Sequence, residues 1–542
     1  MTSSGKDQRV SWIAWGDLNA FFGLMLDNLL NLVVLTGLLV GVFQFPQEFA
    51  LARMIPGTAL GVLVGDLVYT WMAVKLARST GRDDVTAMPL GLDTPSTIGI
   101  ALVVLGPAYM AARGEGLGED DAAMVSWQVG MATMIVMGLV KVGFAFVGDW
   151  VRRTVPAAGL LGSLAGIGLA LLGFFPLLHI FRAPVVGMIA LGLVVYGLMA
   201  GRSLPFRVPA AFAAVLVGTV LFHVLGPAGL LGLEYEAPSL LLSPAAPVPT
   251  LGFVEGMGRA LSYLPVAIPF GILTIVGGIN VTESARLAGD DYRTRDILLT
   301  EAVATLIAGV FGGVAQSTPY IGHPAYKRMG GRAGYTLFTG LFIGLGGVLG
   351  FVQFVVRLVP QAAVTPILLF VGLEIMAQAQ HQCRKEHAVA VGLAILPSVA
   401  ELVRIVLAGF GHTDPAALQG EPAGQLEVIL LLGRGFIITA MLWGAAAAHV
   451  IDGRLRTAGY YMLICAVMTL LGLVHSILPS GGLYVVWQSQ PPPEGLVGLV
   501  TQLPSGVWAG WQLPGLLPRL VALGYSILAL GLLISPDRRK QR

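Results

Sequence analysis

The chain has 542 residues, of which 56% are hydrophobic and only 11% are charged, and its formal net charge at pH 7 is +2. A soluble domain carries about a quarter charged residues, so this composition excludes a soluble globular protein and indicates a polytopic membrane protein. The small net charge argues against a nucleic-acid partner. The two cysteines, Cys383 and Cys465, form neither a disulfide framework nor a metal-ligand pattern.

Apolar runs near the length that crosses a bilayer recur along the chain. They predict spans near residues 18–42, 49–76, 89–112, 122–147, 155–172, 184–199, 208–225, 261–285, 301–312, 316–329, 335–354, 362–379, 388–410, 426–449, 459–478 and 516–534. These spans divide the chain into an N-terminal segment (1–17), a first seven-span repeat (18–225), an extracytoplasmic loop (226–260), a second seven-span repeat (261–449), two additional spans (450–535) and a tail (536–542). An odd number of spans per repeat places the two halves in opposite orientations, as in many secondary transporters. The predicted fold is an all-α membrane protein with two inverted repeats.

Positively charged residues follow every second predicted span. Lys75 and Arg78 follow the second span, for example, and Arg152 and Arg153 follow the fourth. Because Lys and Arg favour cytoplasmic loops, this alternation predicts an inner or plasma membrane protein with both termini in the cytoplasm.

The third and tenth spans are interrupted in similar ways. Residues 91–99 and 315–322 each contain Thr-Pro, a neighbouring hydroxyl group and a nearby Ile-Gly. Irregular backbone at membrane depth occurs only where it lines a cavity or is buried in protein. Paired interruptions in corresponding positions of two halves indicate the substrate site of a transporter.

The predicted substrate-binding residues lie at these two breaks and in the Gly-rich eighth span. They are Asp93, Thr94, Ser96, Thr274, Asn280, Gln316, Ser317, Thr318 and Tyr320. A helix that starts at a break offers free N–H groups to a substrate oxygen or an anion. Asp93 and Thr94 are also good N-caps, and capping is compatible with substrate contact.

Three ionisable groups are candidates for ion coupling, because such groups inside spans are functional candidates by default. Asp27 shares a helix face with Asn31. Glu283 either couples transport to an ion or pairs with Arg286 at the end of its helix. His323 is either a proton carrier or a satisfied structural residue.

We expect other charged side chains in the spans to have structural roles. We expect Lys141 to pair with an acidic group such as Asp66, and Glu401 to pair with Arg404 three positions away. The sequence has no nucleotide-binding loop and no recognised catalytic motif. We therefore expect the protein to be neither an enzyme nor an ATP-driven pump, and we expect it to bind no cofactor and no metal ion.

Three patches resemble the nucleobase–ascorbate transporter superfamily of xanthine and uracil permeases, in particular the adenine/guanine/hypoxanthine permeases. They are residues 87–96, residues 317–320 with 330–334, and residues 365–372. The resemblance implies a core domain and a gate domain, short strands in spans three and ten, and elevator-type alternating access with proton or sodium coupling. The chain departs from the family pattern in two places. The family commonly has an acidic residue in the eighth span, but residues 273–277 contain none. The family also has a glutamate shortly after the tyrosine of the tenth span, where this chain has Ile321, Gly322 and His323.

The expected function is therefore a secondary-active permease for a small polar solute, a nucleobase or related heterocycle. One alternative is an anion transporter of the sulfate-permease type, which shares the scaffold and uses half-helix N-termini instead of binding-site carboxylates. An alternative of another class is an intramembrane enzyme or a non-transporting receptor. The expected partners are the solute, the lipid bilayer and a coupling ion, and the sequence leaves a homodimer open.

Overall fold

The computed structural model describes residues 11–146, 156–202, 204–205, 208–238, 242–320, 323–409, 421–476 and 516–537. Parts of the predicted elements lie outside these ranges, namely residues 1–10, 147–155, 321–322, 410–420, 477–515 and 538–542, and so does the side chain of Asn280. Within the described ranges, eight helices are long and apolar enough to cross a membrane, or ten if two sharply bent helix pairs each form one span. The prediction of a mostly helical, multi-pass membrane protein is confirmed.

The first half of the chain is helical except for one short strand. Its helices are α1 (Gly16–Phe43), α2 (Gln47–Phe49), α3 (Ile55–Thr80), α4 (Thr94–Gly99), α5 (Gly106–Gly114), α6 (Glu119–Phe144), α8 (Ala157–Ile167), α9 (Phe175–Arg182), α10 (Pro184–Val194) and α11 (Ala210–Leu225). Widened π-helical segments connect several of them: η1 (Ala50–Met54), η2 (Ile100–Leu105), η3 (Gly168–Phe174) and η4 (Val195–Met199).

Three of these π-helical segments lead into an α-helix that has a proline in its first turn. Pro56, Pro107 and Pro176 are each the second residue of the α-helix that follows. Proline has no N–H to donate, and its ring clashes with the carbonyl four residues earlier. A wider turn accommodates both defects, so the helices run on as continuous spans over Gln47–Thr80, Thr94–Gly114 and Ala157–Arg182.

The second half contains the remaining helices. They are α12 (Gly252–Ala260), η6 (Leu261–Tyr263), α13 (Leu264–Leu287), α14 (Thr294–Val310), α15 (His323–Arg328), α16 (Gly334–Leu349), α17 (Phe351–Leu358), α18 (Gln361–Gln382), η7 (Lys385–His387), α19 (Ala388–Gly409), α20 (Glu421–Gly433), α21 (Phe436–Ile451), α22 (Leu455–Leu470) and α24 (Leu516–Ile534). The short span expected at 301–312 is a full helix, α14, that begins seven residues earlier.

Two predicted straight spans are sharply bent. Helices α16 and α17 meet at 84°, and α20 and α21 meet at 79°. Gly350 (φ +84°) lies at the first bend and Gly435 (φ +70°) at the second. Glycine adopts this left-handed backbone conformation without the steric penalty of a side chain, so each helix can end and restart within one or two residues.

The predicted short strands in spans three and ten are present and paired. Strand β1 (Leu90–Leu92) and strand β2 (Ser317–Pro319) form a two-stranded antiparallel ribbon in which Gly91 lies opposite Thr318. Residues from the two halves of the chain therefore meet at the two interrupted spans.

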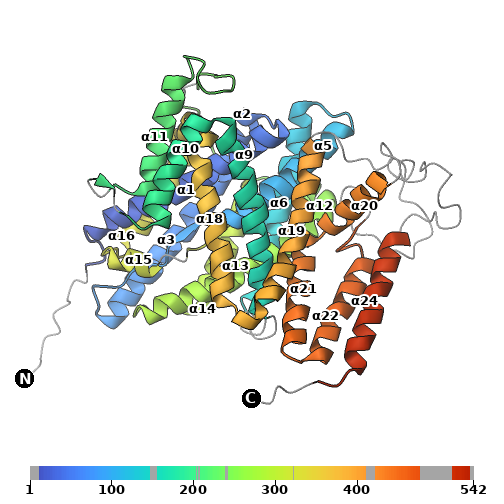
Figure 1. Ribbon diagram of the computed structural model, residues 1–542. Coiled ribbons are helices and arrows are strands. Elements are labelled where there is room, and N and C mark those ends of the chain that lie inside the picture. The colour runs from blue at the N-terminus through green and yellow to red at the C-terminus, as the bar shows by residue number, and fades with distance from the viewer. Residues whose placement is uncertain are drawn as a thin grey trace, which may run out of the picture.

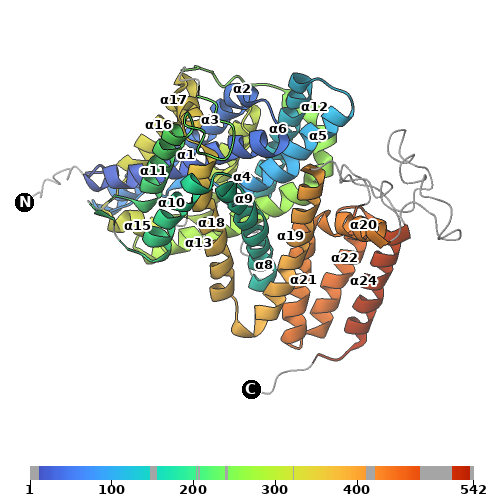
Figure 2. The ribbon, with the colours of Figure 1, turned by 45° about the horizontal axis from the view of Figure 1, so that its top comes forward.

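The C-terminal helices form one edge of the molecule. In both ribbon views α21, α22 and α24 lie together, on the opposite side from α1 and α16 (Figures 1 and 2). The Tyr525 hydroxyl of α24 lies 2.8 Å from His475 Nε2 and accepts a hydrogen bond of 2.8 Å from Trp443 Nε1 of α21. These contacts attach the last helix to the rest of the bundle.

Candidate functional site

The ribbon of β1 and β2 has one buried face and one polar face. Side chains alternate between the two faces of a strand, and residues directly opposite each other in an antiparallel pair share a face. One face carries Leu90, Leu92, Ser317 and Pro319, all of which are buried. The other, which we call the polar face, carries Gly91 and Thr318, and Thr318 is only half-buried.

Backbone hydrogen bonds extend this alternation beyond both ends of the ribbon. The Asp93 N–H donates to the Gln316 carbonyl at 3.0 Å, and the Tyr320 N–H donates to the Pro89 carbonyl at 2.8 Å. Asp93, Gln316 and Tyr320 therefore belong to the polar face as well. Gln316 is fully buried and Tyr320 is 37% exposed, so the polar face leads from an enclosed end to an accessible one.

Asp93 ends the first strand and caps the helix that follows. Its Oδ2 accepts a hydrogen bond of 3.0 Å from the Ser96 N–H, and the Ser96 hydroxyl donates to the Asp93 carbonyl at 3.2 Å. The predicted N-cap role of Asp93 is confirmed. Thr94 and Ser96 lie in the first turn of the helical span Thr94–Gly114, whose N-terminus starts at the ribbon.

Helix α1 holds the same strand from the other side. Asn28 Oδ1 accepts a hydrogen bond of 3.0 Å from the Leu92 N–H, and Asn31 Nδ2 donates to the Leu92 carbonyl at 3.3 Å. A Cβ placed on Gly91 would lie 3.3 Å from Asp27 Oδ2. Because Gly91 has no side chain, the carboxyl group of Asp27 lies directly over the polar face.

The buried face rests on an ion pair that the sequence did not reveal. Lys141 of α6 and Glu301 of α14 lie 2.7 Å apart, and both side chains are fully buried. Lys141 Nζ also donates to the Ser317 carbonyl at 3.2 Å. The expected partner of Lys141, Asp66, is wrong: α6 packs against α14, whereas Asp66 of α3 lies against Gly340 of α16.

The remaining predicted substrate residues are less close to the polar face. Ser317 points to the buried face, and the Thr274 hydroxyl donates to carbonyls of its own helix, Phe270 and Gly271, at 3.2 and 3.1 Å. Glu283 lies in the last turn of α13, where its carboxylate pairs with Arg286 at 2.5 Å. Of the coupling candidates, Asp27 is the one that the structure brings to the ribbon.

His323 belongs to a separate charged cluster, which we call the Asp290 clasp: Arg82, Thr86, Asp290, His323 and Lys327. The buried Asp290 carboxylate accepts hydrogen bonds of 2.8 Å from Lys327 Nζ and 3.1 Å from the Thr86 N–H. Arg82 lies 3.3 Å and His323 Nε2 lies 3.4 Å from the same carboxylate. The clasp joins the segments before β1 and after β2 to the turn between α13 and α14.

The partners of Asp290 outweigh the effect of its burial. Burial by itself raises the pKa of Asp290, but hydrogen bonds from His323, Lys327 and the Thr86 amide, together with the Lys327 charge, hold that pKa below its ordinary value. The carboxylate is therefore charged at neutral pH. No local sequence pattern marks this cluster, because its members come from three segments more than thirty residues apart.

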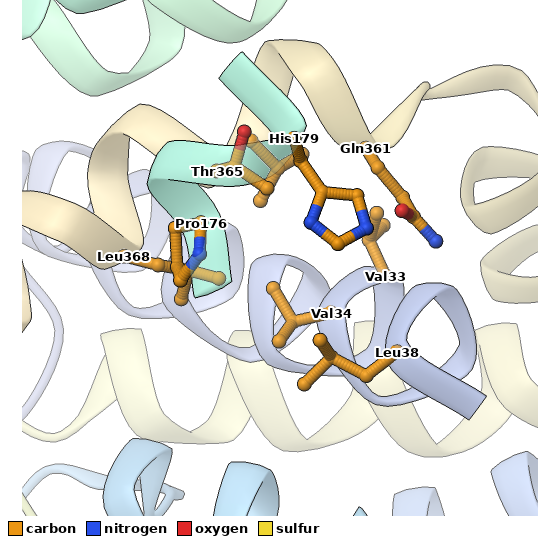
Figure 3. Close-up of a pocket in the computed structure, with 9 residues that line it drawn as sticks. Val33, Val34, Leu38, Pro176, His179, Gln361, Thr365 and Leu368 are labelled. Atoms are coloured by element: carbon orange, nitrogen blue, oxygen red, sulfur yellow. The ribbon is translucent and has the colours of Figure 1, made fainter. Parts of the chain in front are cut away.

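A small cavity lies near the ribbon but is not part of it. It is bounded by Val33, Val34 and Leu38 of α1, Pro176 and His179 of α9, and Gln361, Val364, Thr365 and Leu368 of α18 (Figure 3). Its volume of about 10 Å³ holds about one water molecule. In this conformation the cavity is too small for a solute, so the polar face of the ribbon is the better candidate site.

Among the described residues, no group of three or more His, Cys, Asp or Glu side chains is arranged to hold a metal ion. The polar face instead combines carboxyl, amide, hydroxyl and phenol groups from both halves of the chain. Such a set can hydrogen-bond a small polar solute or coordinate a hard cation through oxygen atoms.

Comparison with known proteins identifies the fold. No family model and no curated protein matches this chain. Among solved structures, the transmembrane domain of a cyanobacterium bicarbonate transporter, BicA, matches with a TM-score of 0.51 and 16% identity, covering 74% of this chain and 100% of that one. The structure of SLC26A9 matches with a TM-score of 0.48 and 11% identity, covering 72% of this chain and 66% of that one. The murine anion transporter Slc26a9 in the inward-facing state matches with a TM-score of 0.45 and 14% identity, covering 73% of this chain and 67% of that one.

These neighbours correct the family expected from the sequence motifs. The expectation of a nucleobase–ascorbate permease is wrong, because the fold matches the transmembrane domain of a bicarbonate transporter. At 16% identity the likeness to BicA shows the fold alone. The chain thus has the fold of a membrane transporter, with its two interrupted spans meeting in a strand ribbon.

Proposed function

We propose that this protein is a secondary-active transporter of a small inorganic anion and that the anion binds at the polar face of the β1–β2 ribbon. The observation that carries the proposal is the ribbon itself, where two interrupted spans meet beside the N-terminus of the helix Thr94–Gly114. A helix N-terminus favours negative charge through its free N–H groups and dipole. The fold shared with BicA supports the choice of an anion, and makes bicarbonate the first solute to test.

The proposal extends to how the protein moves its solute. Residues 18–225 and 261–449 would form two inverted repeats, with spans one to four and eight to eleven as a core domain that carries the ribbon. The remaining repeat spans would form a gate, and the core would slide against it in an elevator-type cycle. The two C-terminal helices, α22 and α24, would lie outside the repeats. The enclosed Gln316 and accessible Tyr320 ends of the polar face support a site that opens in one direction at a time.

The test is transport by the purified full-length chain in liposomes. We expect uptake of labelled bicarbonate, sulfate or chloride, and no uptake of a labelled nucleobase. Gln316→Leu should lower the anion flux by about tenfold, because it removes hydrogen-bonding groups from the polar face. Thr219→Val is the matched control, since the Thr219 hydroxyl of α11 is also buried without a partner in the described structure, but away from the ribbon. Absence of flux for every anion tested would refute the proposal.

A further inference from the structure

The β1–β2 ribbon has two outer edges, each of which needs partners for its backbone groups. In an antiparallel pair, residues alternate between bonding to the partner strand and directing their N–H and C=O groups away from it. The Asp93 N–H donates to the Gln316 carbonyl, so the next opposed pair, Leu92 and Ser317, directs its backbone groups to the outer edges. At membrane depth such groups must be satisfied inside the protein.

Helix α1 closes the edge of β1 with uncharged groups. The Leu92 N–H donates to Asn28 Oδ1 at 3.0 Å, and Asn31 Nδ2 donates to the Leu92 carbonyl at 3.3 Å. Two side-chain amides thus take the place of a third strand. At Leu92, the edge of β1 is therefore closed without a charged side chain.

The edge of β2 is closed by a charged side chain. Pro319 has no N–H to satisfy, and the Ser317 carbonyl accepts a hydrogen bond of 3.2 Å from Lys141 Nζ of α6. The same ammonium group lies 2.7 Å from Glu301 Oε1 and 3.2 Å from Thr305 Oγ1, both on α14. An ammonium group has three N–H donors, and these three oxygen atoms are enough to occupy all of them. Lys141 is therefore held in one position, and so is the carbonyl that it binds.

Stability alone does not require a charged pair at this place. Burying two charges costs desolvation, and well-packed apolar residues of similar volume are often as stable. What Lys141 adds is a fixed point on β2: the Ser317 carbonyl belongs to the peptide group that leads into Thr318, and Gln316 comes directly before Ser317. The two polar-face side chains of this segment are thus carried by the backbone that Lys141 holds. A binding site needs its groups within about 0.5 Å of their productive positions, so a loosely held strand would weaken it.

We propose that Lys141 is a positioning residue for the anion site, acting through the outer edge of β2. Because Lys141 is fully buried and lies behind the strands, it acts on the solute by fixing the direction of Gln316 and Thr318 and not by contact. The inference rests on the proposed function, since it needs an anion at the polar face. It implies that anion affinity depends on a hydrogen-bond donor at residue 141 and not on the charges of the pair.

The test compares two double variants of the full-length chain in liposomes. The first, Lys141→Met with Glu301→Leu, removes both charges and the donor; the second, Lys141→Gln with Glu301→Gln, removes both charges and keeps an amide donor at residue 141. The probe is whichever labelled anion the wild type transports: bicarbonate, sulfate or chloride. We expect the KM of the first variant to rise about tenfold, because the bond that holds the site is lost, with Vmax within about twofold of wild type. The KM of the second variant should stay within about twofold of wild type.

A purely structural role would give a different result. Both variants would then lower Tm or Vmax alike and leave KM unchanged, which overturns the inference; an equal rise in KM for both also overturns it, because the effect would belong to the charges. If the first variant does not fold, Lys141→Met with Glu301→Gln, which keeps the volume of residue 301, replaces it with the same expected rise in KM. Wild-type flux with an unchanged KM in the variant without the donor overturns the inference but leaves the proposed function standing. A wild type that moves none of the three anions refutes both.

Discussion

At the scale of single residues, the buried pair of Lys141 and Glu301 supports the ribbon from behind. Lys141 bridges Glu301 at 2.7 Å and the Ser317 carbonyl of β2 at 3.2 Å. Lys141→Met should lower the unfolding free energy by about 3–5 kcal/mol, because it leaves a buried carboxylate without its partner. Thermal unfolding of the detergent-solubilised protein measures this as a lower Tm.

The double variant provides the control for that prediction. Lys141→Met combined with Glu301→Leu removes both charges, so we expect it to recover most of the stability lost in the single variant. A double variant as unstable as the single one would show that the loss comes from packing around Lys141 and not from the unpaired charge.

Residue contacts were predictable from the sequence where the partners are near neighbours. The Asp93 cap, the Glu283–Arg286 pair and the Glu401–Arg404 pair all join residues three apart, and helix geometry alone brings such residues together. The partner of Lys141 was not predictable, because it depends on which helix packs against α6. Spacing along the chain contains no information on that choice between α3 and α14.

At the scale of elements, a close contact joins the start of α3 to the segment between α14 and β2. A Cβ on Gly57 would lie 2.2 Å from the Phe311 carbonyl oxygen and 2.4 Å from the Gly313 nitrogen, both of them backbone atoms. Gly57→Ala should therefore destabilise the protein by about 1–3 kcal/mol. Gly143→Ala is the control, because a Cβ there meets nothing within 4 Å; its Tm should not fall. Equal Tm values for the two variants would contradict the proposed contact.

The elements themselves were largely predictable, and their irregularities were not. Apolar length located most helices, and Thr-Pro with nearby glycine located the two breaks that form β1 and β2. The bend at Gly350 follows a glycine-rich run, Gly340 to Gly347, that stays helical, and Gly435 comes two residues after Gly433, which is also helical, so glycine content does not single out either bend. The family assignment failed for a related reason: the short motifs locate where the backbone of a span is interrupted, and an interrupted span by itself does not identify the solute.

At the scale of the whole molecule, the Asp290 clasp joins segments from both halves of the chain. Because the folded-state pKa of Asp290 is lowered, the charged carboxylate contributes stability above its unfolded pKa of about 3.9, and this contribution is lost as the pH falls through the folded value. Asp290→Asn should cost about 1–3 kcal/mol at neutral pH. The difference in Tm between wild type and Asp290→Asn should shrink below about pH 4. A difference that stays constant into acid would show that the charge of Asp290 is not what stabilises the clasp.

The orientation of the molecule in the membrane is the last prediction, and it tests the span count on which the inverted repeats depend. Positive charge after the second predicted span places Ser79, at the exposed end of α3, in the cytoplasm, and one full span then places Asp120, at the exposed start of α6, outside. The native Cys383 and Cys465 are buried, so a membrane-impermeant maleimide should report mainly on an introduced thiol. We expect Ser79→Cys to react in inside-out vesicles and Asp120→Cys to react in right-side-out vesicles. Reaction of both from one side would mean that the interrupted segment with Asp93 enters and leaves by the same face, which is incompatible with two inverted seven-span repeats.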